Sequence, residues 1–195
     1  MKKWLPLIII AGLAIVVYVT LSGKYNTMVT LDEASNTAWS NVETQYQRRA
    51  DLIPNLVNTV KGYASHEKDV LESVTQARAS ATSYKIDPND ITPENIKKFQ
   101  ELQSSLSRAL SRLLAVVERY PDLKANQNFL ELQAQLEGTE NRISVERPRY
   151  NQAIMDYNVY VRKFPNNMLS GMFGFDKKSA FEAEEGSEKV PEVSF

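Results

Sequence analysis

The chain has 195 residues, with 23 lysines and arginines against 24 aspartates and glutamates, so its formal net charge is −1. A balanced charge lacks the basic excess that a nucleic-acid-binding protein needs, and the length fits one domain. The sequence contains no cysteine and one histidine, His66, which excludes disulfides, thiol nucleophiles and zinc sites built from cysteine or histidine. We therefore expect no cofactor, no metal site, no catalytic residues and no nucleic-acid partner.

The first segment, residues 1–24, is predicted to anchor the chain in a membrane. Leu5 to Leu21 form an uncharged, strongly apolar run. As a helix this run is about 26 Å long, close to the thickness of the hydrocarbon core of a bilayer. No good small-residue cleavage site follows it, which favours an uncleaved transmembrane anchor over a signal peptide.

The charges around this run predict its orientation. Lys2 and Lys3 precede the apolar run, whereas only Lys24 follows it within the next 20 residues. The positive-inside rule then places the N-terminus in the cytoplasm and residues 24–195 on the other side of the membrane.

The body of the chain, residues 25–164, is predicted to be an elongated antiparallel four-helix bundle. Apolar residues recur every seven positions, the spacing of helices that pack along one seam at shallow angles. The expected helices cover residues 28–63, 66–84, 94–120 and 125–164. The rows with this spacing are Trp39, Tyr46, Ile53 and Val60, then Phe99, Leu106, Leu113 and Tyr120, then Phe129, Leu136, Ile143, Tyr150, Tyr157 and Phe164.

Prolines mark both helix ends and interruptions in this pattern. Thr92 is a suitable cap for the third helix, with Pro93 at its first position, and the fourth helix is expected to end before Pro165. Pro54 and Pro148 fall inside patterns that continue in phase, so they predict kinks, and Pro148 leaves open a division of the fourth helix into two.

Some polar residues fall on or beside the apolar rows. Arg49, Glu140 and Arg147 form a candidate polar layer, because a buried charge requires a partner. Two interpretations stay open: an internal ionic layer that fixes helix register, or side chains whose stems pack while their charged ends reach water. Asn151 and Asn158, seven residues apart, lie beside two tyrosines of the fourth row.

The tail, residues 165–195, has three lysines and six acidic residues, yet it is rich in large apolar residues. One interpretation is a strap that folds back onto the bundle, and the other is a docking peptide for a partner. The candidate docking residues are Val190, Pro191, Val193 and Phe195, because an alternating apolar run that ends in a carboxylate suits strand addition or carboxylate capture.

Four motifs follow one another along the chain: YQRRADLIPNLV at residues 46–57, YPDLKAN at 120–126, EGTENRI at 137–143 and VPEVSF at 190–195. This series resembles the LemA family. The resemblance implies a bacterial single-pass protein of the inner membrane with a helical-bundle domain. The family has no established enzymatic activity, so it supplies no catalytic residues. Its members are often encoded near membrane-bound zinc metalloproteases, which makes a membrane protein of that kind the expected partner.

These observations predict a non-catalytic, membrane-anchored scaffold or adaptor of the bacterial envelope, linked to membrane protein quality control or envelope stress. An alternative is a binding module for a lipid or another apolar ligand, with Tyr150 and Tyr157 lining a slot between helices. An enzyme would require convergent carboxylates in a cleft. A homo-oligomer through one of the long helices also stays open.

Overall fold

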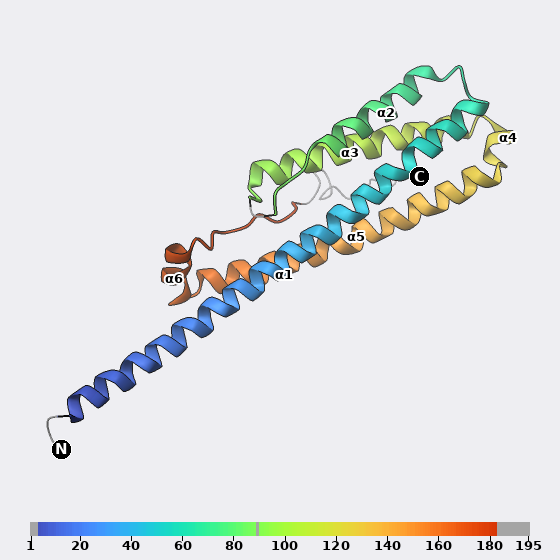
Figure 1. Cartoon of the computed structure of the whole chain (residues 1–195). Helices are drawn as coiled ribbons and strands as arrows, with labels where there is room; N and C mark the ends of the chain where they lie inside the picture. The colour runs from blue at the N-terminus through green and yellow to red at the C-terminus, as the bar shows by residue number, and fades with distance from the viewer. Residues whose placement is uncertain (1–3, 89, 183–195) are drawn as a thin grey trace, which may run out of the picture.

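The computed structural model describes residues 4–88 and 90–182, and within these ranges the chain is all-helical (Figure 1). This confirms the predicted all-α class. The described helices, in chain order, are α1 (Leu5–Tyr63), α2 (Lys68–Ser83), α3 (Pro93–Val117), α4 (Pro121–Lys124), α5 (Gln127–Arg162) and α6 (Asn166–Phe173).

Helix α1 joins the apolar run to the first helix of the body without a break. It has 59 residues and continues through Pro54, so residue 24, the expected end of the anchor, lies inside a helix. Helix α5 likewise continues through Pro148 over 36 residues. The open possibility of two helices in this region is therefore wrong.

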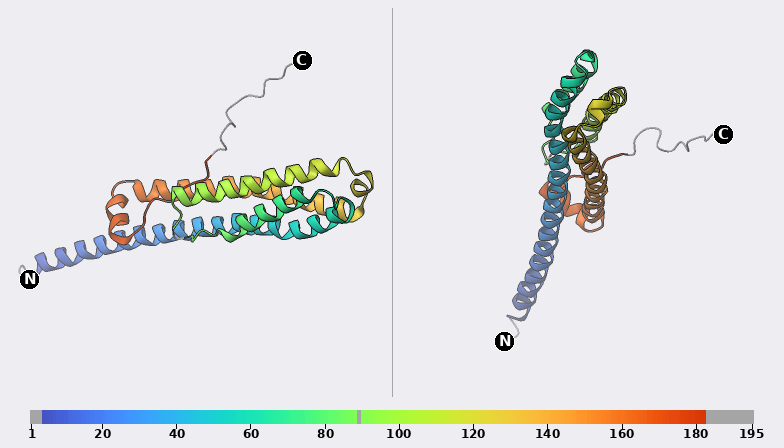
Figure 2. Two further views of the ribbon diagram at one scale, coloured as in Figure 1. Left: turned by 90° about the horizontal axis from the view of Figure 1, so that it is seen from above. Right: turned by 90° about the vertical axis from the view of Figure 1, so that its right-hand side faces the viewer.

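The long helices form an elongated rod (Figure 1). Helices α1 and α5 run antiparallel along its length, and α2 and α3 form a second antiparallel pair beside them (Figure 2). The short helix α4 turns the chain from α3 into α5 at the end of the rod far from the N-terminus. The N-terminal part of α1 projects beyond the other helices (Figure 1).

The core consists of three successive clusters along the rod, which are built by different sets of helices. The cluster at the far end combines residues of α1, α2, α3 and α5, among them Leu56, Val74 and Leu113. The middle cluster lacks α2 and gains Phe181 from the tail. The cluster nearest the projecting arm combines α1 and α5 with the partly buried Leu169 of α6 and Phe175 of the tail. Four helices therefore surround the core only in the far half of the rod.

Most residues of the seven-residue rows are buried, as predicted. Tyr120 is only partly buried, and Phe164 is 82 % exposed because α5 ends at Arg162. The residue before a proline disfavours the helical conformation, and Pro165 follows here. Thr92 caps α3 by accepting a hydrogen bond from the backbone N–H of Asn95 at 3.2 Å.

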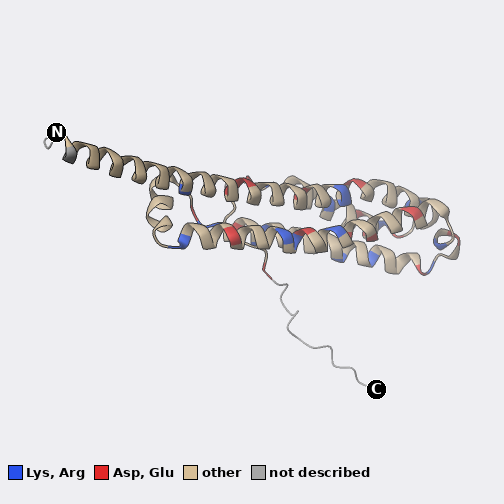
Figure 3. Cartoon of the chain, turned by 90° about the horizontal axis from the view of Figure 1, so that it is seen from below, with Lys and Arg blue, Asp and Glu red and all other residues tan. Residues whose placement is uncertain are grey.

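The projecting arm of α1 is apolar and uncovered. Within the described residues, α1 is long and apolar enough to cross a membrane, and its apolar window has no buried residue. Met28 is the first core residue along the chain. Charged residues are mixed in sign along the bundle and absent from most of the arm (Figure 3). Exposed apolar area costs about 25 cal/mol per Å² in water, so this arm favours a membrane environment.

Candidate interaction site: the buried polar layer and the C-terminal strap

Arg49 on α1 links three helices through a side chain that is only 2 % exposed. Its Nη1 lies 2.6 Å from Oε1 of Glu140 on α5 and donates to Oγ of Ser107 on α3 at 3.0 Å. Its Nη2 donates to Oε1 of Gln103 on α3 at 2.6 Å. The side chain of Glu140 is 46 % exposed. The pair thus combines a buried cation with a carboxylate that also reaches water.

Arg147 lies farther along α5 than Glu140 and takes a different partner. Its guanidinium carbon is 4.9 Å from the centroid of the Phe181 ring, in a cation–π contact with the tail. Arg49, Glu140 and Arg147 also line one cavity of about 70 Å³ between α1, α3 and α5. The structure therefore places all three residues around one small cavity but pairs only Arg49 with Glu140 directly.

Residues 175–182, here called the strap, lie on the bundle and run back along α5. Asn158 donates from Nδ2 to the carbonyl oxygen of Lys178 at 2.8 Å and accepts from the Lys178 N–H at 3.0 Å. Asn151 repeats this pattern with Phe181, at 3.0 Å and 2.9 Å. Each asparagine amide thus satisfies both backbone groups of one strap residue.

The spacing of these two contacts follows from the geometry of helix and extended chain. Asn151 and Asn158 are seven residues apart, which is about 10.5 Å along a helix. Lys178 and Phe181 are three residues apart, which is about 10 Å in extended chain. The two spacings match, so the strap can satisfy both amides at once only in this register.

Two tyrosines of α5 bind further carbonyl oxygens of the strap. The hydroxyl of Tyr150 donates to the carbonyl oxygen of Ser179 at 2.7 Å, and that of Tyr157 to the carbonyl oxygen of Asp176 at 2.8 Å. Burial raises the pKa of Tyr150 above its usual value. Burial, together with the carboxylates of Asp32 and Asp176, raises the pKa of Tyr157 from 10 to about 12. Both hydroxyls are therefore neutral donors at physiological pH.

Lys178 connects the strap to α1. Its Nζ lies 2.8 Å from Oδ1 of Asp32 and donates to Oγ of Ser35 at 3.0 Å and to Oδ1 of Asn36 at 2.6 Å. The same ammonium lies 5.4 Å from the centroid of the Tyr157 ring. A buried cation that is paired and hydrogen-bonded in this way is costly to separate from its partners.

Phe181 completes the middle cluster of the core. Its ring stacks on Trp39 with centroids 5.8 Å apart and meets Tyr150 edge-on at 5.3 Å. Trp39 also contacts Phe99 at 5.3 Å. The strap therefore supplies an aromatic side chain to a position that α2 is too short to cover.

The strap interpretation of the tail holds for its described part. The candidate docking residues Val190, Pro191, Val193 and Phe195 lie outside the described residues. Sequence reasoning missed Lys178 as an anchor, whereas the repeated Tyr-Asn pair at 150–151 and 157–158 was a visible signal without an assigned partner. His66 is exposed in the link between α1 and α2. Within residues 4–88 and 90–182, no group of three or more His, Cys, Asp or Glu is placed to hold a metal ion.

Comparisons with known proteins cover both the polar layer and the strap. A model of the LemA family matches residues 38–195. Magnetosome protein MamQ 2 of Paramagnetospirillum magneticum is 29 % identical over 194 residues, which cover 90 % of this chain and 71 % of the relative. Magnetosome protein MamQ of Magnetospirillum gryphiswaldense is 28 % identical, with 88 % and 70 % covered. Protein LemA of Metamycoplasma hominis is 24 % identical, with 94 % and 80 % covered.

The polar layer predicts unequal effects of removing two glutamates. Glu140→Ala leaves the buried Arg49 without its carboxylate and should lower the free energy of unfolding by about 3 kcal/mol. Glu118→Ala removes an exposed ion pair with Lys124 and should cost less than about 1 kcal/mol. Urea unfolding of the detergent-solubilised protein, followed by circular dichroism, measures both. Equal losses would mean that Arg49 does not depend on its partner.

The strap register predicts residue-specific changes in amide hydrogen exchange. Asn158→Ala should speed exchange at Lys178, and Asn151→Ala should speed it at Phe181, because each variant removes the acceptor of that N–H. Gln152→Ala is the matched control, since its amide donates to Asp156 on the exposed face of α5. Unchanged exchange at both strap residues would contradict the assigned register.

The raised pKa of Tyr157 predicts a loss of stability in alkali. In the unfolded chain this hydroxyl ionises near pH 10, whereas in the folded protein it ionises near 12. Its contribution is complete below pH 10 and declines as the pH rises toward 12. Tyr157→Phe removes this titration, so its stability should fall less steeply over that range. Thermal melting at a series of pH values tests this, and identical slopes for the two proteins would refute it.

Proposed function

The chain belongs to the LemA family, and from this premise we propose that it is a membrane-anchored, non-catalytic helical scaffold of the bacterial envelope. The observation that carries the proposal is the continuity of α1. One helix provides both the exposed apolar arm and a full side of the bundle core. A flexible linker would let the bundle tumble, whereas a continuous helix holds it at a fixed position relative to the anchor.

The proposed anchor is a single pass through the bilayer by Leu5 to Leu21. With the N-terminus in the cytoplasm, the bundle stands outside the inner membrane. The part of α1 from residue 24 to its end then extends about 59 Å from the membrane surface. A rod of this length suits a protein that holds a partner at a set height above the bilayer.

The proposed partner contact is the end of the tail, with Val190, Pro191, Val193 and Phe195 as docking residues. Support comes from the strap, which holds the chain up to residue 182 on the bundle, so that the following peptide starts from a fixed point. A membrane protein is the partner class we propose, with a membrane metalloprotease as the example implied by family association. Such an adaptor would serve membrane protein quality control.

The alternative function, binding of an apolar ligand between helices, has less support. Tyr150 and Tyr157 are buried, and the strap takes both hydroxyls. A groove of about 300 Å³ between α2 and α3 is lined largely by serines and arginines. Neither place offers the apolar lining with a few polar groups that such ligands require.

Crosslinking in cells tests the scaffold proposal. A membrane-impermeant crosslinker added to spheroplasts should join the full chain to defined membrane proteins, since the bundle is proposed to lie outside. Deletion of residues 183–195 should remove these products and leave the melting temperature unchanged. Deletion of residues 175–195 is the control for the strap and should lower the melting temperature as well, because it removes Lys178 and Phe181.

Two outcomes would contradict the proposal. Crosslinks that persist in the 183–195 deletion would show that the tail does not dock a partner. A lack of reaction in intact spheroplasts, with reaction after lysis, would show that the bundle lies in the cytoplasm.

A further inference from the structure

The geometry points to a second membrane contact: the outer face of α6 and the turn before it rest on the lipid surface beside the spanning part of α1. This face consists of Phe164, Met168, Met172 and Phe173, and we call it the foot. The inference rests on the proposed crossing of the membrane by α1.

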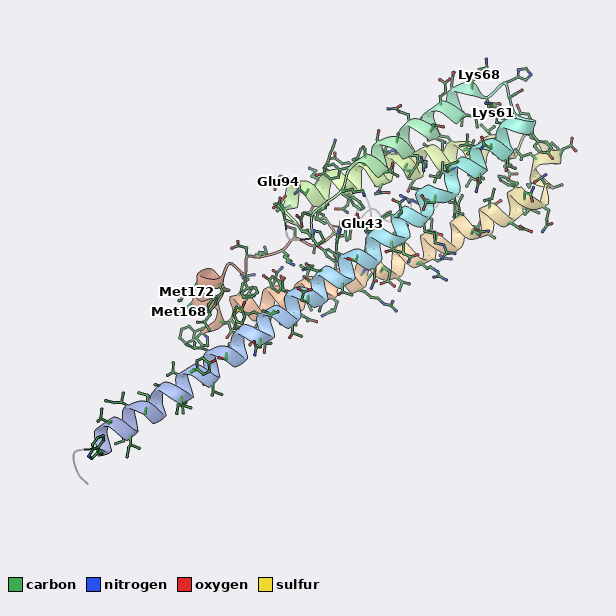
Figure 4. The ribbon with its side chains drawn as sticks, in the orientation of Figure 1. Glu43, Lys61, Lys68, Glu94, Met168 and Met172 are labelled. Atoms are coloured by element: carbon green, nitrogen blue, oxygen red, sulfur yellow. The ribbon has the colours of Figure 1, made fainter. Side chains whose placement is uncertain are left out.

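The foot lies where α1 leaves the bundle. Nζ of Lys24 donates to Oδ1 of Asn166 on α6 at 2.9 Å. The ring of Tyr25 contacts Phe173 edge-on, with centroids 5.0 Å apart. Met168 and Met172 lie on α6 beside this part of α1 (Figure 4). Helix α6 is thus fixed to α1 at the junction between the apolar arm and the bundle.

This junction coincides with the expected surface of the bilayer. From Leu5 to Lys24, α1 rises about 29 Å, and the hydrocarbon core of a bilayer is about 30 Å thick. Lys24 and Tyr25 therefore stand at the level of the lipid headgroups. Tyrosine and lysine are residue types that favour this interface. Because α6 contacts both residues, it lies at the same level.

The polarity of α6 is reversed relative to a surface helix in water. Two of its three polar residues face the protein: Asn166 and Ser170 are buried and donate to the carbonyl oxygens of Tyr160 and Val161, whereas Asn167 is exposed. Leu169 packs against the core, but the other large apolar residues face outward, with Met168 64 % and Met172 75 % exposed. A helix that buries two of its polar residues while most of its large apolar residues are exposed indicates a nonaqueous surface on the outside.

The charges around the foot fit lipid headgroups. Residues 166–175 contain no charged side chain. Arg162 and Lys163 precede them, Asp176 and Lys177 follow them and Lys24 lies beside them, so four of these five charges are basic. Apolar residues flanked by basic ones are typical of helices that lie in the interface and attract anionic lipids. Methionine and phenylalanine can enter the acyl boundary while the basic groups stay among the phosphates.

The bilayer is a better occupant than a second protein because of continuity. The exposed apolar surface of the foot adjoins the exposed apolar arm of α1, and the two meet at Tyr25. Once the arm enters the membrane, lipid is the medium that faces the foot. Two contacts of this kind, one spanning and one on the surface, would also fix the tilt of the rod.

Depth-dependent fluorescence quenching tests the foot in the full chain. Because the sequence has no cysteine, Met172→Cys gives one labelling site for a polarity-sensitive fluorophore. The protein is reconstituted into phosphatidylcholine–phosphatidylglycerol vesicles that carry a nitroxide either near the headgroup or deep on the acyl chain. Met168→Cys provides a second reading from the same face, and circular dichroism checks that each variant is folded.

Two control positions separate this inference from the proposed anchor. Ile9→Cys, on the arm, should be quenched most by the deep nitroxide. Leu130→Cys, an exposed apolar position at the far end of the rod, should be quenched by aqueous iodide and by neither nitroxide. The label at Met172 should be quenched several-fold more strongly by the headgroup nitroxide than the label at Leu130.

Each remaining outcome overturns the foot. If Ile9 is quenched by lipid nitroxides and Met172 responds only to iodide, the foot faces water while the anchor stands. If Met172 is shielded from both lipid and iodide, protein covers the foot. If Ile9 also escapes the lipid nitroxides, the proposed anchor itself fails.

Discussion

The helices of this rod have unequal lengths, and their apolar stripes must nevertheless be covered from end to end. Helix α5 has 36 residues, whereas α2 has only 16, so α2 cannot shield the half of α5 that lies nearer the membrane. If this apolar surface were left exposed to water, the free energy of folding would be less favourable by about 25 cal/mol for each Å². The strap resolves this difference. It places Phe181 against Trp39 and Phe99 where no fourth helix is present.

The same arrangement explains why polar residues occur among the apolar rows of α5. An extended segment that lies on a bundle carries backbone N–H and C=O groups that have no partners of their own, and leaving them buried without partners would be costly. Asn151, Asn158, Tyr150 and Tyr157 provide these partners from a helix whose own backbone is already satisfied. Between helices, Arg49 provides the polar contacts, since its guanidinium links α1 to both α3 and α5.

The sequence alone predicts the helices well, because the seven-residue spacing and the uncharged arm are local patterns. It misses Phe164, where Pro165 ends the helix before the row does, and it leaves Pro148 open. Packing of Ile143 and Tyr150 on either side outweighs the lost hydrogen bond there. The strap is harder to predict because it takes part in these hydrogen bonds through its backbone, which leaves no trace in the sequence of the strap. The contact of Lys178 with Asp32 joins residues from opposite ends of the chain, and no local pattern reports such a pair.

Recognition of the strap through its backbone has a consequence for how this protein can vary. The side chain of Ser179 takes no part in the hydrogen bonds to the two asparagines, so the chemistry of this position is free to vary, whereas Ala180 packs against the middle cluster and is restricted to side chains that fit there. The number of residues between Lys178 and Phe181 cannot change in this way, because one added or deleted residue would displace either the ammonium from Asp32 or the ring from Trp39. Relatives that keep this core are therefore expected to differ in the strap by substitution and to agree in its length.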